Sequence, residues 1–208
     1  MKPVSRGLLS VLFFALPAFA GSQIEGIRNF RQVNDHVYRG GQPTSEGLKY
    51  LAQIGVKTVL DLRVDDSLSL AEKQAVTALG MQFVNVPMTG LTPPTPEQIT
   101  KILGLLEETN GGPVFVHCRR GADRTGAVIA AYRIDHDHWD NVRALKEAMS
   151  DGMSFFQWPR QSFIRKFQPM TVAAATEAKS EPAETKGPAT VPQPAAVPAA
   201  AVAASAVN

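Results

Sequence analysis

The chain has 208 residues, of which 44% are hydrophobic and 19% are charged, and its formal net charge at pH 7 is +2. This length allows one ordinary domain with a hydrophobic core. The near balance of charges excludes the strongly basic character typical of nucleic-acid-binding proteins, so we expect no nucleic-acid partner.

The first 20 residues have the organisation of a secretory signal peptide. Lys2 and Arg6 precede an apolar run over residues 8–20 that ends in Ala-Phe-Ala, the small-x-small pattern of signal-peptidase cleavage. An uncleaved anchor is the alternative, but the run has 13 residues and a membrane-spanning helix needs about 20. We therefore expect a mature protein that begins at Gly21, is periplasmic or secreted, and has no stable membrane insertion.

Residues 21–170 are predicted to form one domain in which strands and helices alternate. Residues 40–43 ("GGQP") mark a turn, and Thr44 caps a helix that runs to Ile54 and stops at a glycine. The apolar segment "VKTVLDLR" follows as a buried strand.

The same alternation continues along the chain. Ser69 and Glu72 form a predicted capping box for a helix that ends at Gly80, before the strand "MQFVNVPM". Thr95 and Gln98 start another helix by the same chemistry, and "PVFVH" is the next strand. Further helices are predicted in "TGAVIAAYRIDHD", "DNVRALKEAM" and "RQSFIRKF". Apolar strands joined by helix-length connections predict an α/β domain, with a mostly parallel sheet and helices on both faces.

Residues 171–208 are predicted to be a disordered tail. They consist mostly of Ala, Pro, Thr, Glu, Lys and Val and contain no aromatic residue. Such a segment cannot bury enough apolar surface to offset the entropy lost on ordering. An extended Pro-rich spacer that binds a partner is the alternative.

The stretch "VFVHCRRGADRTG", residues 114–126, contains the only cysteine of the chain, Cys118. In an oxidising compartment a structural cysteine normally has a disulfide partner, so Cys118 is either an inert buried thiol or a reactive one. It lies where a predicted strand ends, and open α/β sheets bind ligands beyond the carboxyl ends of their strands. The following loop leads directly into a helix that starts near Thr125. We expect the backbone N–H groups of this loop and helix N-terminus to bind a tetrahedral oxyanion.

The residue types around this cysteine fit such a site. Gly121 permits the positive φ that a tight loop needs, and Gly126 is expected to leave space beside the site. Arg124 has a planar fork of donors that can bind two phosphate oxygens. Because a helix N-terminus and fixed cations lower the pKa of a nearby cysteine, Cys118 is expected to be a thiolate. His117 either holds the loop by hydrogen bonds or is a structural histidine.

The segment "HCRRGADRTG" resembles the H-C-x5-R-[ST]-G signature of the cysteine-based protein tyrosine phosphatases. Residues 29–167 as a whole are similar to the small bacterial dual-specificity phosphatases, some of which are exported. The resemblance implies that Cys118 is the nucleophile that forms a phosphocysteine. It also implies that Arg124 stabilises the transferring phosphoryl group and that Thr125 assists departure of the thiolate. By the same resemblance, the substrate phosphate would be held by Arg119, Arg120, Gly121, Ala122, Asp123 and Arg124.

The chain departs from that family at the general acid. Such phosphatases commonly take an aspartate from a loop upstream of the signature, and "NVPMTGLTPPTPEQ" contains none. Some proton donor is favoured, because the leaving group is an alkoxide or phenoxide. Asp123 is the expected acid, as in the "DRTG"-type loops of some relatives. Glu97 is the second candidate or an ordinary first-turn glutamate, and Asp65 and Asp66 are the third candidates or solvated loop carboxylates.

The predicted function is therefore that of a phosphomonoester hydrolase acting through a phosphocysteine, most simply a tyrosine or dual-specificity protein phosphatase. Arg119 and Arg120 either favour a polyanionic substrate or only tune the thiol. An inositol phosphate or phosphoinositide phosphatase is accordingly the alternative, and a non-catalytic phosphate-binding module is a further one. A thiol oxidoreductase or persulfide carrier is disfavoured because the chain has no second cysteine. The expected partner is a phosphorylated protein or a small polyanionic phosphoester.

No metal and no cofactor are expected. The spacing of the histidines shows no ligand array with carboxylates, although one pair lies two residues apart next to an aspartate. These histidines are His36, His117, His136 and His138. Four aromatic residues are assigned to the core rather than to a pocket wall. They are Trp139, Phe155, Phe156 and Trp158.

Overall fold

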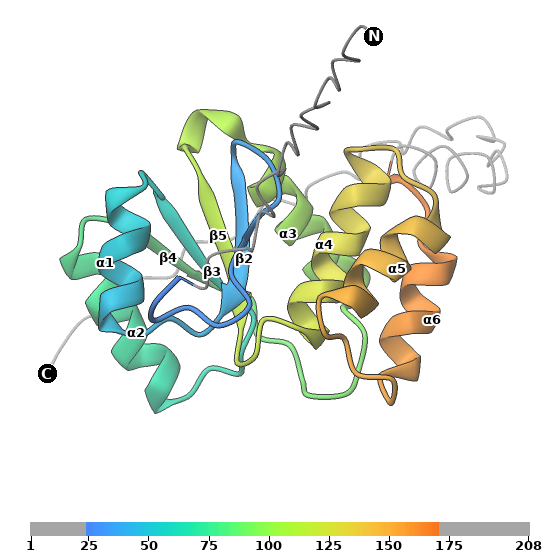
Figure 1. Cartoon of the computed structure of the whole chain (residues 1–208), viewed down its shortest axis with the longest axis horizontal. Helices are drawn as coiled ribbons and strands as arrows, with labels where there is room; N and C mark the ends of the chain where they lie inside the picture. The colour runs from blue at the N-terminus through green and yellow to red at the C-terminus, as the bar shows by residue number, and fades with distance from the viewer. Residues whose placement is uncertain (1–23, 171–208) are drawn as a thin grey trace, which may run out of the picture.

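A five-stranded sheet separates two layers of helices (Figure 1). The computed structural model describes residues 24–170, so the predicted signal peptide and tail lie outside the described residues. The strands are β1 (Arg31–Gln32), β2 (Val37–Gly41), β3 (Thr58–Asp61), β4 (Gln82–Asn85) and β5 (Val114–Cys118). The helices are α1 (Ser45–Gln53), α2 (Ser67–Ala78), α3 (Pro96–Glu107), α4 (Asp123–Asp135), α5 (Asn141–Ser150) and α6 (Trp158–Lys166), and a 3-10 turn η1 covers Thr109–Gly111. Within this described range, no helix is both long and apolar enough to span a bilayer.

The sheet order confirms the predicted, mostly parallel α/β architecture. The strands lie in the order β1-β2-β5-β3-β4, and only β1 runs antiparallel to its neighbour. Helices α1 and α2 cover one face of the sheet, and α3 to α6 lie on the other side (Figure 1). Because β5 pairs with both β2 and β3, its last residue, Cys118, lies in the middle of the sheet's carboxyl edge.

Side chains of β5 alternate between the two cores, as the period of an extended strand requires. Val116 and Cys118 pack in the core with Ile102 of α3, whereas Phe115 packs with Leu51 of α1. All of these side chains are at most 2% exposed. The alternation fixes the side of the sheet to which the thiol belongs, namely the α3 and α4 side.

Two of the predicted helix starts are confirmed by their caps. The Thr44 hydroxyl accepts a hydrogen bond from the Gly47 amide at 3.3 Å, at the start of α1. Thr95 and Gln98 form a complete capping box at the start of α3, with distances of 2.9 and 3.2 Å. These local patterns were sufficient because all of their atoms lie within one turn of the chain.

The predicted capping box of Ser69 and Glu72 is wrong. Helix α2 starts earlier, and its cap is Asp66, which accepts hydrogen bonds from the Leu68 and Ser69 amides at 3.0 Å. The Ser69 hydroxyl instead donates to Asp61 at 2.9 Å, and Glu72 points into the protein. The earlier start turns both side chains inward, where they join a buried polar network.

The predicted turn at residues 40–43 is also wrong in part, because Gly40 and Gly41 are the last residues of strand β2. Their lack of side chains allows another segment to approach. Gly121 has a φ of 70° and packs so closely on this strand that a Cβ there would lie 2.6 Å from the Gly40 carbonyl oxygen. Glycine is therefore required at the contact between β2 and the loop that follows Cys118.

Candidate active site

A pocket of about 280 Å³ opens where β5 meets α4. Cys118 ends the strand and α4 begins at Asp123, slightly earlier than the predicted start near Thr125. We call residues 118–124 the phosphate loop. The pocket is lined by Gly90, Cys118, Arg119, Arg120, Asp123, Arg124 and Gln157. The structure thus brings five residues of the predicted site to one pocket, while Ala122 and Thr125 are buried behind it.

Cys118 is 2% exposed, yet its surroundings favour the thiolate. Burial raises the pKa of the thiol, but hydrogen bonds from the Thr125 hydroxyl and amide, the charge of Arg124 and the Arg120 amide together lower it below its ordinary value. Within the described residues, the buried Thr125 Oγ1 has no hydrogen-bond partner of ordinary geometry, the sulfur included, so the hydroxyl is free to turn toward the sulfur when the thiolate forms. The lowered pKa agrees with the thiolate expected from the sequence.

The Thr125→Val variant is expected to raise the pKa of Cys118 toward its ordinary value. A hydrogen bond to a charged group is worth about 1.5–3 kcal/mol, and valine removes it without changing the volume. Because only the thiolate reacts, the pH midpoint of iodoacetamide alkylation should move upward. Thr100→Val, which removes a hydroxyl from the exposed face of α3, is the control. An unchanged midpoint in Thr125→Val would show that the hydroxyl does not stabilise the thiolate.

Two arginines approach the pocket from different helices. Arg124 Nη1 lies 3.3 Å from the carbonyl oxygens of Leu62 and Met88, which follow β3 and β4. Both contacts are at the long end of hydrogen-bond lengths, so this guanidinium can exchange them for phosphate oxygens. Arg160 of α6 is fully buried and donates to the Thr89 and Gly90 carbonyls at 2.6 and 2.7 Å. Burial and the charge of Arg124 lower the pKa of Arg160.

A buried clamp holds the carbonyl of Gly121 on the outer side of the phosphate loop. Arg39 Nη2 and Asn29 Nδ2 both donate to this carbonyl, the latter at 2.9 Å. Asp151 pairs with Arg39 at 2.8 Å and with Arg31 at 2.8 Å, and its carbonyl accepts from Asn29 at 2.7 Å. Because this carbonyl is held from β2 and from the end of α5, the loop backbone is fixed before any ligand arrives.

The Asn29→Gly variant is expected to lose about 1 to 3 kcal/mol of unfolding free energy, because two part-buried hydrogen bonds disappear. Asn29 has a φ of 55°, a left-handed conformation that glycine adopts without strain, so the change isolates the amide group. Urea unfolding at neutral pH measures the effect. Wild-type stability would contradict a structural role for this clamp.

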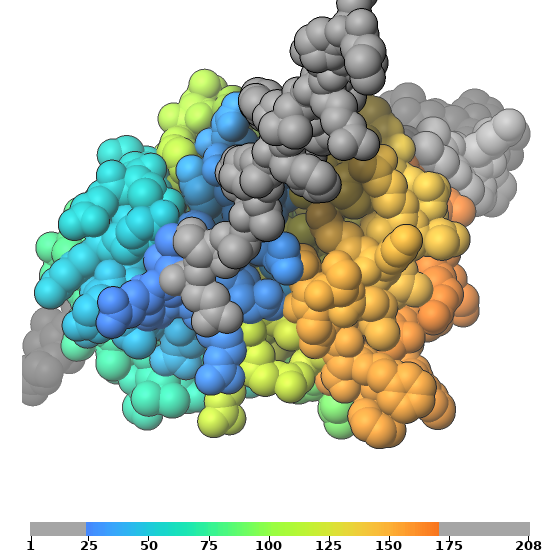
Figure 2. Space-filling view, viewed as in Figure 1, coloured from blue at the N-terminus to red at the C-terminus, as the bar shows by residue number. Residues whose placement is uncertain are grey.

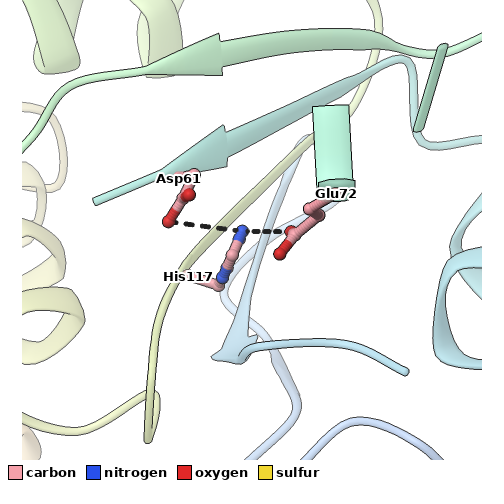
Figure 3. Close-up of side chains that lie close together, drawn as sticks. All are labelled: Asp61, Glu72 and His117. Atoms are coloured by element: carbon pink, nitrogen blue, oxygen red, sulfur yellow. Dashed lines mark ion pairs between the residues drawn. The ribbon is translucent and has the colours of Figure 1, made fainter. Parts of the chain in front are cut away.

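Behind the loop, His117 lies in a buried polar network with residues of β3 and α2 (Figure 3). Its Nε2 is 2.8 Å from Glu72 and 3.8 Å from Asp61, and its Nδ1 is 3.4 Å from the Cys118 carbonyl oxygen. Arg63 bonds Asp61 at 2.8 Å and Glu72 at 2.6 Å. Burial raises the pKa of Asp61, but the Arg63 hydrogen bonds and the His117 charge outweigh it and leave that pKa below its ordinary value. Of the two predicted roles for His117, these contacts favour the structural histidine, because its near contact is with Glu72 and its contact with the loop is the 3.4 Å approach to the Cys118 carbonyl.

The same network brings a histidine and two carboxylates together in space. Donor atoms of Asp61, Glu72 and His117 lie within 4.8 Å of one another, an arrangement that sequence spacing could not indicate because the three residues come from different elements. The guanidinium of Arg63 already bonds both carboxylates and supplies the neutralising charge. The cluster is therefore built as an ion-pair network, and a metal ion would have to compete with that guanidinium.

The positions of the four candidate acids distinguish Asp123 from the other three. Asp123 lines the pocket, where one oxygen accepts from the Ser154 amide at 2.7 Å and the other from Arg120. Glu97 is exposed on the first turn of α3, and hydrogen bonds from the Thr95 side chain and its own amide lower its pKa. Asp66 caps α2, and Asp65 is exposed. Within residues 24–170, therefore, only Asp123 of these four lines the pocket.

The assignment of all four aromatic residues to the core is wrong. Phe155, Phe156 and Trp158 are 63%, 76% and 64% exposed; the first two lie in the segment that joins α5 to α6, and Trp158 is the first residue of α6. Trp139 is half-buried under two cations, with the Arg133 and Arg143 guanidinium carbons 4.6 and 3.6 Å from its ring centroid. Gly126 also differs from its expected role, since it provides close packing of α4 on α5 rather than space at the site.

A protein-family profile described as "DSP-PTPase phosphatase fused to NAD+ kinase" matches residues 18–166. The chain belongs to this DSP-PTPase family. The matched span includes the phosphate loop, the clamp on Gly121 and the polar network behind His117.

Relatives of this DSP-PTPase chain carry several descriptions. A probable chloroplastic NAD kinase 2 of Oryza sativa subsp. japonica is 33% identical over 46% of the chain and 10% of its own length. The dual specificity protein phosphatase TpbA of Pseudomonas aeruginosa is 29% identical over 65% of the chain and 60% of its own length. An inositol diphosphatase of Arabidopsis thaliana is 26% identical over 50% of the chain and 53% of its own length. The chain thus spans less than two thirds of the length of each of these relatives.

Among solved structures, that of P. aeruginosa TpbA in complex with phosphotyrosine has a TM-score of 0.60. The match has 21% sequence identity and covers 74% of this chain and 91% of the other. It shows that the DSP-PTPase chain shares the fold of that protein.

The DSP-PTPase phosphate loop was predicted from the sequence, but the residues that support it were not. Arg39 and Asn29 bond the loop from segments far away in the chain, Asp151 holds Arg39, and Arg160 holds the segment at Thr89 and Gly90 beside the pocket. One signal was available, because a charged residue inside an otherwise buried strand, as at Arg39, needs a buried partner. Its partner at the end of α5 had no recognisable pattern.

Proposed function

We propose that the chain is a metal-independent phosphomonoester hydrolase that acts through a phosphocysteine at Cys118, with phosphorylated proteins as substrates. The observation that carries the proposal is the thiol itself. Its pKa is lowered by Thr125 and Arg124 at the point where a strand, a tight loop and a helix N-terminus meet in one pocket. A phosphate group bound at that helix N-terminus would lie against the nucleophile.

The proposed reaction has two steps. Sγ of Cys118 attacks phosphorus, the bond from phosphorus to the ester oxygen breaks, and the leaving oxygen takes a proton from Asp123. Water then attacks phosphorus and gives a proton to the Asp123 carboxylate, which restores the acid, while the sulfur–phosphorus bond breaks and the Thr125 hydroxyl stabilises the thiolate that leaves. Arg124 and the loop amides hold the phosphoryl oxygens throughout. To act as the acid, Asp123 must carry a proton, so it has to leave the ion pair with Arg120.

A second candidate function is hydrolysis of inositol phosphates. Arg119 and Arg120 both line the pocket and are exposed, which provides fixed positive charge for phosphates beyond the one being cleaved. The similarity to an inositol diphosphatase supports the same alternative. Wild-type protein that binds phosphate but hydrolyses no ester would indicate the third possibility, a non-catalytic phosphate-binding module.

One panel assay separates these functions. The chain from Gly21 is incubated with phosphotyrosine and phosphoserine peptides, inositol hexakisphosphate and an inositol diphosphate, in the presence of reductant and EDTA, and released phosphate is measured. We expect turnover of the phosphotyrosine peptides with the highest kcat/KM. Preference for the inositol substrates would replace the first function by the second. Activity that requires an added divalent metal would contradict the phosphocysteine mechanism.

We also propose that the chain is exported and that residues 1–20 are removed. The proposal is supported by the charged start, the apolar run and the small-x-small pattern in the sequence. A periplasmic or secreted enzyme would meet phosphorylated proteins or phosphoesters outside the cytoplasm. Mass spectrometry of the protein in a periplasmic fraction should give the mass of a chain that begins at Gly21. A full-length chain confined to the cytoplasm would overturn this proposal.

A further inference from the structure

Three exposed aromatic side chains form a cluster that the proposed chemistry does not use. Phe155, Phe156 and Trp158, which we call the aromatic rim, are each more than 60% exposed. Their rings pack edge to face, with centroid distances of 4.8 Å between Phe155 and Phe156 and 6.5 Å between Phe155 and Trp158. Scattered exposed apolar residues are ordinary, but a contiguous aromatic cluster is typical of a binding surface.

The segment that carries the aromatic rim is bonded to the wall of the pocket. The Ser154 amide donates to Asp123, and Gln157 lines the same pocket as Cys118. The Gln161 side chain, which is buried, donates to the Ser154 and Phe155 carbonyls at 3.3 and 3.1 Å. Phe156 and Trp158 are therefore direct chain neighbours of the pocket residue Gln157, and the carbonyls of Ser154 and Phe155 are held from α6.

The space-filling view agrees with this placement. The segment between α5 and α6 projects at the lower right, beside the green connection from β4 to α3 and near the phosphate-loop region (Figure 2). Arg160 joins the two connections by its bonds to the Thr89 and Gly90 carbonyls. The pocket thus has a cationic side at Arg119 and Arg120, and its wall at Gln157 is flanked along the chain by the aromatic rim residues Phe156 and Trp158.

We propose that the aromatic rim binds an apolar side chain next to the phosphorylated residue of a protein substrate. This inference rests on the proposed function and names the substrate class within it. An inositol phosphate has no apolar surface to cover three aromatic rings, whereas a phosphorylated segment offers both an anion for the arginines and apolar neighbours for the rings. Aromatic residues together with arginine are also the composition of protein-binding hot spots. A membrane is disfavoured as the occupant, because removal of Lys2 and Arg6 leaves 19 basic and 19 acidic residues and no excess charge to attract anionic lipid.

The test compares two phosphotyrosine peptides that differ only beside the phosphotyrosine, where one has leucines and the other serines. Phe156→Ala is the principal variant, since its ring is 76% exposed and its loss should not affect folding. We expect the ratio of kcat/KM for the leucine peptide to that for the serine peptide to fall about tenfold, the effect of losing one hot-spot contact. Trp158→Ala should lower the same ratio. The matched control is Leu70→Ala, an exposed apolar residue on α2 across the sheet, which should keep the wild-type ratio.

Binding is measured separately from turnover so that the two proposals can fail independently. In the Cys118→Ser background, calorimetry should show that Phe156→Ala weakens binding of the leucine peptide about tenfold and leaves the serine peptide unaffected. If the wild-type protein showed no turnover, the proposed function would be refuted. The calorimetric comparison of the two peptides would still decide whether the aromatic rim binds an apolar side chain. An unchanged leucine-to-serine ratio in both measurements would overturn the inference. A membrane-binding result would also overturn the inference. In that case the wild-type chain would cosediment with phosphatidylglycerol vesicles, and Phe156→Ala would abolish this cosedimentation without changing peptide binding.

Discussion

The Cys118→Ser variant is expected to lose phosphatase turnover by a factor on the order of 10⁶, the size of effect that follows removal of a covalent nucleophile. Serine retains the loop and accepts the same hydrogen bonds, but its hydroxyl is far less acidic than a thiol. The contacts that lower the pKa of Cys118 cannot make it an alkoxide at neutral pH. The measurement is release of phosphate from a phosphotyrosine peptide under single-turnover conditions.

Binding of a phosphate analogue should survive in the same variant. Tungstate, as a tetrahedral oxyanion, would still bind to Arg124 and the amides of the loop. Because serine carries no negative charge, the variant also lacks the repulsion between the thiolate and the bound anion. Calorimetric titration should therefore give an affinity at least equal to that of the wild-type protein. Turnover at the wild-type rate by Cys118→Ser would exclude the phosphocysteine mechanism, and loss of tungstate binding would mean that the loop had collapsed.

The Asp123→Asn variant is expected to slow hydrolysis of alkyl phosphates by roughly 10²–10⁴ while it has little effect on p-nitrophenyl phosphate. An alkoxide needs a proton as it leaves, whereas nitrophenolate departs without one. If Asp123 is the acid, wild-type activity on alkyl phosphates falls as pH rises, because the protonated carboxyl is the form required. The basic limb of the pH–rate profile should then be absent in Asp123→Asn.

The contacts of Asp123 define the competing result. This carboxylate accepts from Arg120 and from the Ser154 amide, so it also ties the phosphate loop to the segment before α6. A purely structural role would produce losses of equal size on the alkyl and the nitrophenyl ester. Glu97→Gln is the control, because that side chain is exposed and Asp123 is the candidate that lines the pocket. If Glu97→Gln instead slowed the alkyl ester more than the nitrophenyl ester, Glu97 and not Asp123 would be the general acid.

The nucleophile Cys118 and the proposed general acid Asp123 are held by different contacts. Burial raises the pKa of Cys118, and the groups that lower it, Thr125, Arg124 and the Arg120 amide, all lie within seven positions of it in the chain. The position of Asp123 depends in addition on Ser154, which follows it by 31 positions. Mutations in the segment between α5 and α6 should therefore disturb leaving-group protonation more than thiol ionisation.

The phosphate loop could be predicted from the sequence because its geometry is local. A buried strand, a glycine with positive φ and a helix start follow one another within residues 114–126, so their residue types can be recognised in a short stretch of sequence. The same holds for the caps at Thr44 and Thr95, whose partners are at most three residues away. Hydrophobic periodicity likewise predicted the alternation of strands and helices, and with it the parallel sheet.

Only the tertiary structure decided which distant residues complete the site. Arg39 reaches the Gly121 carbonyl across 82 positions, and no periodic pattern links two such residues. Ser69 and Glu72 fit a capping pattern equally well, but burial against Asp61 and Arg63 determined where their side chains point. The rings of the aromatic rim have the composition of a core and yet remain at the surface. Their positions follow from packing of α6 on the rest of the fold, a long-range balance of contacts that residue type alone does not determine.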